Sequence, residues 1–70
     1  MLNAEIHTLD VVALTEDIPA HDLRRGQVGT VVETLSSDIF EVEFIDNDGR
    51  TYATLPLQSR QLFVLHYQPA

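Results

Sequence analysis

The chain has 70 residues, the size of a single domain. It contains no cysteine, which excludes disulfides and thiolate metal sites and leaves stability to a small apolar core. Four arginines and no lysine stand against 11 carboxylates, and the formal net charge of −7 opposes binding to nucleic acids and to anionic membranes.

The N-terminal third predicts a short extension, a strand and a long loop. Residues 1–9 are expected to be extended or to form a short helical turn, with the extended form favoured. Asp10–Thr15 is short and rich in β-branched side chains, which is typical of a strand. Glu16–Gly26 is polar, contains Pro19 and closes on a glycine, so it is predicted to be a loop.

Two further strands are predicted on either side of a turn at Ser36–Asp38. The first is Gln27–Leu35, where the internal Gly29 indicates a bend, a bulge or a close backbone approach. The second, Ile39–Ile45, alternates apolar side chains with glutamates. This period of two is typical of a strand with one buried face.

Asp46–Gly49 predicts a hairpin, because Asp-Gly between two strand patterns favours a tight turn. A calcium loop is not favoured: with Gly49 at the sixth position, Phe44 and Leu55 occupy the first and twelfth positions, where acids are needed. Arg50–Pro56 is then the returning strand.

The C-terminal part predicts one helical turn followed by a last strand. Leu57–Gln61 is too short for a longer helix and fits a single turn. Leu62–Tyr67 is apolar and closes the chain as a strand.

These elements predict an all-β fold, a small five-stranded SH3-like barrel with a long first loop and a one-turn helix before the last strand. Residues 1–70 are expected to form one domain, with an N-terminal extension at 1–9 and the barrel at 10–66. The side chains expected to point inward are Val12, Leu14, Val28, Val31, Phe40, Val42, Phe44, Tyr52, Leu55, Leu62 and Val64.

A family resemblance extends from about Leu9 to Leu65. Its motifs are DVVAL at residues 10–14, Pro19, RG at 25–26, VGTVV at 28–32, and EVEF at 41–44 with the later DG at 48–49. On these motifs the chain resembles an uncharacterised domain-of-unknown-function family of small bacterial proteins. The resemblance implies the barrel fold and no established activity.

A shorter motif, RRGQVGTVV at residues 24–32, is similar to the KOW-type strand of translation and transcription proteins. That likeness implies RNA binding. Similar loops also occur in SH3-like subunits of photosynthetic and redox complexes, where the barrel is a docking piece. The surrounding acids weaken the attraction of Arg24 and Arg25 for a polyanion, so Gly26 and Gly29 are interpreted as backbone features.

Catalytic, metal and cofactor sites are not predicted. His7, His21 and His66 have no ligand spacing, although a barrel can bring distant residues together, and a zinc site from His21, His66 and an acid stays open. The serines lie in predicted turns without an adjacent base. Glu41 and Glu43 are expected on a solvated outer face, which does not suit acid–base catalysis.

The sequence therefore predicts a small, acidic, non-catalytic module that docks on, or neutralises, a basic protein partner. An antitoxin or an immunity protein is one example of such a module, and the alternative is a KOW-like nucleic-acid-binding domain. Part of the apolar segment at residues 62–70 is available to cover a partner or a second copy of the chain, so a homo-oligomer stays open. It also stays open whether the acidity serves only solubility. The candidate partner surface consists of Asp22, Arg24, Arg25, Glu33, Glu41, Glu43, Tyr52 and Tyr67.

A cytoplasmic location is expected. A signal peptide would have a basic segment followed by a long apolar run. The first residues, MLNAEIHTLD, contain neither. No apolar run approaches the ~20 residues that a membrane-spanning helix needs.

Overall fold

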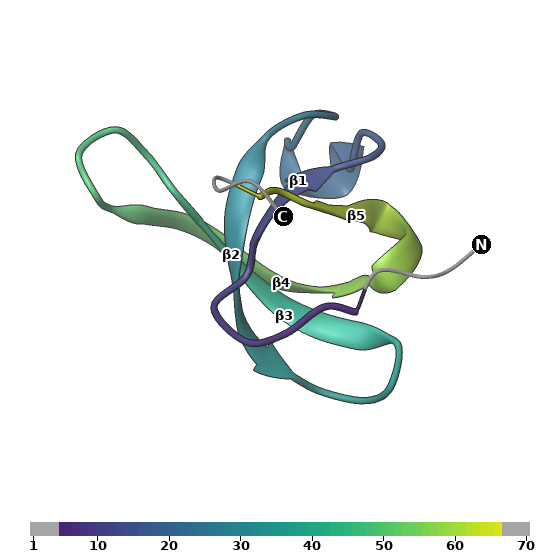
Figure 1. Cartoon of the computed structure of the whole chain (residues 1–70). Helices are drawn as coiled ribbons and strands as arrows, with labels where there is room; N and C mark the ends of the chain where they lie inside the picture. Colours follow the sequence, from purple (N-terminus) through teal and green to yellow (C-terminus); the bar gives the residue numbers. More distant parts are fainter. Residues whose placement is uncertain (1–4, 67–70) are drawn as a thin grey trace.

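Five antiparallel strands form one strongly curled sheet in the computed structural model, which describes residues 5–66 (Figure 1). The strands and the two short 3₁₀ turns are β1 (Val11–Leu14), η1 (Pro19–His21), β2 (Val28–Thr34), β3 (Ile39–Ile45), β4 (Thr51–Gln58), η2 (Ser59–Gln61) and β5 (Leu62–Val64). The predicted fold class is confirmed: the chain is all-β and barrel-like, with a 3₁₀ turn before the last strand.

The sheet has the strand order β4-β3-β2-β1-β5. Tight turns connect β2, β3 and β4, whereas β1 pairs with both β2 and β5 and so joins the two ends of the chain. Two contacts between the residues that follow β1 and the turn η2 strengthen the pairing of β1 with β5. The Thr15 N–H donates to the Gln61 carbonyl over 2.9 Å, and the Arg60 guanidinium lies 3.1 Å from the Glu16 carboxylate.

The core lies inside the curl, and ten apolar side chains of residues 5–66 are buried in it. They are Val12, Leu14, Leu23, Val31, Phe40, Val42, Phe44, Leu55, Leu57 and Leu62. Eight of the eleven side chains that the sequence predicted to point inward are among them, and Val64 packs against the cluster while half-buried. Val28 and Tyr52 were predicted wrongly, because both are exposed.

These two errors follow from strand geometry. Successive side chains of a strand point to opposite faces, so Val28 and Val31 cannot both point inward, nor can Tyr52 and Leu55. β4 is also longer than predicted, and it carries Leu57, assigned from sequence to a helical turn, into the core.

The long loop between β1 and β2 contributes to the core. Ile18 and Leu23 form an isolated bridge across η1, and the Leu23 side chain is only 1% exposed. Gly26 then turns the chain with a φ of +91°, a conformation that disfavours side chains larger than hydrogen. The predicted corner at this glycine is confirmed.

Gly29 marks a close approach between neighbouring strands. A Cβ atom added there would lie 2.8 Å from Val42 Cγ1 and 2.9 Å from Phe44 Cε2. The bulge of β2 lies further along, between Val31 and Glu33. Of the readings that the sequence left open, close backbone approach is the one observed.

The predicted hairpin at Asp46–Gly49 is confirmed, and it projects from the barrel between β3 and β4 (Figure 1). The Asp46 carboxylate accepts hydrogen bonds from the N–H groups of Asp48 and Arg50.

Near the N-terminus, Thr8 and Leu9 form a turn, so the extended prediction for residues 1–9 is wrong there. Residues 1–4 lie outside the described part.

Within residues 5–66, no helix has the length and apolar character needed to cross a membrane.

Candidate partner-binding surface

Three glutamates gather on the outer face of the sheet, the face opposite the core. Because Phe40, Val42 and Phe44 point inward on β3, the alternating Glu41 and Glu43 belong to the outer face. Glu33 of β2 lies directly opposite Glu41. Glu33, Glu41 and Glu43 are called the acidic strip below.

The bulge of β2 determines which residue faces Glu41. Val31 lies opposite Val42, so a regular ladder would place Val32 opposite Glu41 and turn Glu33 toward the core. The extra residue at the bulge shifts the register by one and brings Glu33 to the outer face. The strip therefore depends on a backbone irregularity.

The acidic strip makes no ion pair with a cation of this chain within residues 5–66. The ion pairs found there involve only Glu5, His7, Asp10, Glu16 and Arg60. Glu33 is exposed, and Glu41 and Glu43 are half-buried. The Thr51 hydroxyl donates to Glu43 Oε2 over 2.6 Å, which orients one carboxylate without neutralising its charge.

The neighbours of the strip across the ladders are small and uncharged. Glu43 lies between Thr30 of β2 and Thr54 of β4, and Glu41 has Pro56 of β4 on its other side. These flanking side chains are short, although Glu41 and Glu43 themselves are half-buried. A proline on β4 also fits its place at the edge of the sheet.

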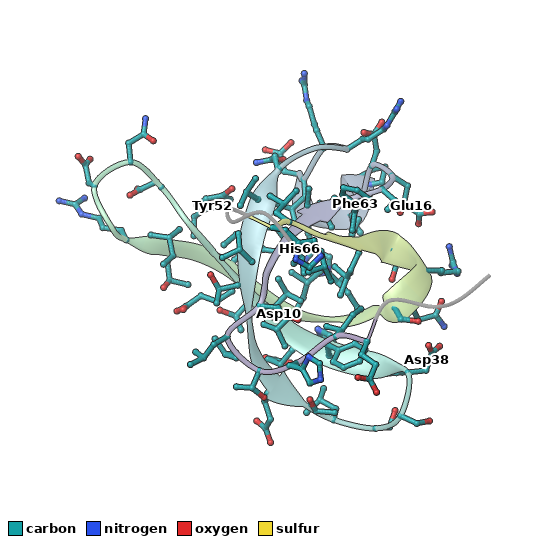
Figure 2. The ribbon with its side chains drawn as sticks, in the orientation of Figure 1. Asp10, Glu16, Asp38, Tyr52, Phe63 and His66 are labelled. Carbon is teal, nitrogen blue, oxygen red and sulfur yellow. The ribbon has the colours of Figure 1, made fainter. Side chains whose placement is uncertain are left out.

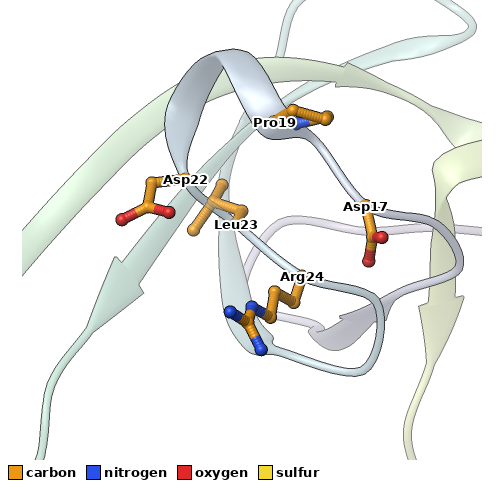
Figure 3. A pocket seen from close by; sticks show the side chains of 5 residues that line it. All are labelled: Asp17, Pro19, Asp22, Leu23 and Arg24. Carbon is orange, nitrogen blue, oxygen red and sulfur yellow. The ribbon is translucent and has the colours of Figure 1, made fainter.

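The loop residues of the predicted surface lie elsewhere, around a shallow pocket of about 210 Å³ (Figure 3). Asp22 and Arg24 line it together with Asp17, Pro19 and Leu23. Its walls carry both signs of charge, and the Asp17 carboxylate already accepts the Arg25 backbone N–H over 2.8 Å. This arrangement stabilises the loop and does not define a ligand.

Tyr52 connects the projecting hairpin to the loop before β2. Its hydroxyl accepts a hydrogen bond from Gln27 Nε2 over 2.9 Å, and its ring centroid lies 6.3 Å from that of Phe44. Tyr52 is labelled in Figure 2. The amide oxygen of Gln27 in turn accepts the Arg24 backbone N–H. Tyr52 is still 48% exposed. Tyr67 lies outside the described residues.

The structure thus divides the predicted surface into three places: the acidic strip, the loop of Asp22, Arg24 and Arg25, and Tyr52. Sequence reasoning missed Val28 as an exposed apolar side chain of the outer face that carries the acidic strip. Phe63, also exposed on that face, belongs to the apolar segment 62–70 that the sequence did single out. The sequence did contain a signal for Val28. Val28 and Val31 are three residues apart on one predicted strand, so their side chains must point to opposite faces.

The family resemblance is confirmed by comparison with known proteins. A family model described as Domain of unknown function (DUF4926) matches residues 8–64. No curated protein and no solved structure matches the chain.

Proposed function

The chain belongs to the DUF4926 family, and from that premise we propose that it is a small, acidic, non-catalytic module that binds a basic protein partner through the acidic strip. We include in the proposal a bacterial, cytoplasmic setting. One form of the proposed binding is neutralisation of the basic partner, as an antitoxin or immunity protein does. The observation that carries the proposal is the direct opposition of Glu33 and Glu41 on the outer face.

Like charges that face each other across a strand pair destabilise a sheet. Within the described residues Glu33 and Glu41 make no ion pair, and Glu43 adds a third carboxylate two residues further along β3. An arginine or lysine brought by a partner would interact with several carboxylates at once. Such complementarity mainly accelerates association and selects the partner.

The positions of the arginines support a protein partner over a nucleic acid. Arg24 and Arg25 lie on the loop before β2, Arg50 follows the turn of the β3–β4 hairpin, and Arg60 belongs to η2. Figure 1 shows the hairpin and η2 on opposite sides of the molecule. Polyanion binding needs several cations along one surface, and these four are spread around the barrel.

The proposal is tested by affinity capture from a lysate of the source organism, with the wild-type chain immobilised. We expect a basic protein to be retained at low salt and released at high salt, because screening weakens exposed ion pairs. The triple variant Glu33→Gln, Glu41→Gln, Glu43→Gln should lose it. A heparin column run in parallel tests the nucleic-acid alternative, and we expect no retention.

The matched control is the triple variant Glu5→Gln, Asp22→Asn, Asp48→Asn, which removes the same charge at exposed positions outside the strip. It should retain the partner. Equal losses in both triple variants would show that net charge alone matters, and the assignment to the strip would then be wrong.

A further inference from the structure

A row of apolar side chains crosses three strands on the outer face. Phe63 of β5 and Val28 of β2 both lie directly opposite Ala13 of β1. These three residues are called the apolar row. Phe63 is 63% exposed and Val28 is 47% exposed, so the row presents its apolar area to solvent. Single exposed apolar residues are common on protein surfaces, but three in register form a continuous patch.

The apolar row lies on the same face as the acidic strip and is connected to it. Val28 and Thr30 are two apart on β2 and therefore share the outer face. Thr30 in turn lies directly opposite both Val11 of β1 and Glu43 of β3. A path along the surface thus leads from Phe63 through Val28 and Thr30 to the carboxylates.

We propose that the apolar row and the acidic strip form one docking surface, and that its occupant is a segment of a basic protein whose apolar side chains pack on Phe63 and Val28 while its cations reach Glu33, Glu41 and Glu43. The inference rests on the proposed function and specifies the chemistry of the partner. Charge complementarity selects this occupant. A second copy of the chain would bring another formal net charge of −7 against the same face.

The two halves of the surface have different tasks. Burial of an aromatic ring and a β-branched side chain supplies affinity, since well-packed apolar anchors dominate binding energies. The carboxylates supply orientation and attraction at a distance. A segment with cations alone, or with apolar side chains alone, would therefore satisfy only one half.

The test uses three synthetic peptides as probes, titrated into the ¹⁵N-labelled full chain and followed by NMR. One alternates lysine and leucine, one alternates lysine and serine, and one alternates glutamate and leucine. We expect the lysine–leucine peptide to bind about tenfold or more tightly than the lysine–serine peptide. It should shift the amide signals of Ala13, Val28 and Phe63, and the glutamate–leucine peptide should not bind.

Substitutions separate this inference from the proposed function. Phe63→Ser and Val28→Thr should each weaken the lysine–leucine peptide severalfold and leave the lysine–serine peptide unchanged. Leu35→Ser is the matched control, because Leu35 is as exposed as Val28, at 47%, and lies outside the row. The triple glutamine variant of the strip should weaken both lysine peptides.

Each contrary result has a distinct meaning. Equal binding of the two lysine peptides, with no effect of Phe63→Ser, overturns the apolar half and leaves the acidic strip in place. No response of either peptide to the triple variant overturns the proposed function as well. Light scattering gives the oligomeric state, and a dimer that Phe63→Ser dissociates would overturn the proposed occupant in favour of a second copy.

Discussion

Glu33 of β2 lies directly opposite Glu41 of β3, so two carboxylates face each other across a strand pair. The variant Glu33→Gln removes this repulsion and should raise the free energy of unfolding by roughly 0.2–1 kcal/mol. Thermal unfolding at low salt measures the gain. It should shrink at high salt, where exposed charges are screened.

Glu5→Gln is the control for that gain, because Glu5 is exposed and outside the sheet. If it raised the melting temperature as much as Glu33→Gln, the gain would come from net charge. A stabilising variant that also loses the partner would indicate that the strip is retained for binding at a cost to the fold.

Gly29, in contrast to Glu33, is a position where a larger side chain should destabilise the sheet. Gly29→Ala places a methyl group within 3 Å of Val42 and Phe44, both fully buried, and should cost about 1–3 kcal/mol. Chemical denaturation measures the cost. Thr30→Ala, one residue along on the outer face, is the control and should change stability far less. A Gly29→Ala variant as stable as the wild type would contradict the close packing described here.

Leu23 makes the long first loop part of the core. Its side chain is 1% exposed, so Leu23→Ala should leave a cavity and cost about 2–5 kcal/mol. Leu35→Ala is the comparison, since Leu35 is half-exposed and should be nearly neutral. If both substitutions shifted the denaturation midpoint equally, the loop would contribute no more than any surface segment.

Asp46 stabilises the β3–β4 hairpin through its side chain, which accepts two backbone N–H groups over 2.8 and 2.9 Å. Asp46→Ala should cost about 1 kcal/mol, while Asp46→Asn keeps an acceptor oxygen and should recover most of that loss. Hydrogen exchange at the amides of Asp48 and Arg50 follows the effect locally. Equal protection in both variants would mean that backbone hydrogen bonds alone hold the turn.

The sequence predicted the strands best where one periodic signal was uninterrupted. The predicted bounds of Ile39–Ile45 are correct, because apolar and acidic residues alternate from Phe40 to Phe44 between two turn signals. The hairpin after it followed from Asp-Gly. Both signals are local, so no knowledge of the rest of the fold was needed.

Apart from Val28 and Tyr52, where local alternation was overlooked, the features that the sequence did not predict depend on distant parts of the chain. The sequence placed Glu33, Glu41 and Glu43 together on the predicted partner surface, but the direct opposition of Glu33 and Glu41 depends on the bulge at Val32, which is set by pairing with β3. Leu23 is buried because the barrel closes over its loop, although its own neighbours are polar. The exposed row through Val28 and Phe63 required the strand order, which composition does not give.

We expect the pairing of β1 with β5 to influence the order in which the structure forms. Val12 and Val64 stand almost at opposite ends of the chain, whereas β2, β3 and β4 are sequential neighbours. Long-range pairing is entropically costly until the chain between has become compact. We expect the three-stranded meander to dominate the folding transition state, so that Val42→Ala slows folding while Val64→Ala mainly speeds unfolding. Stopped-flow kinetics with the opposite pattern would place closure of the barrel first.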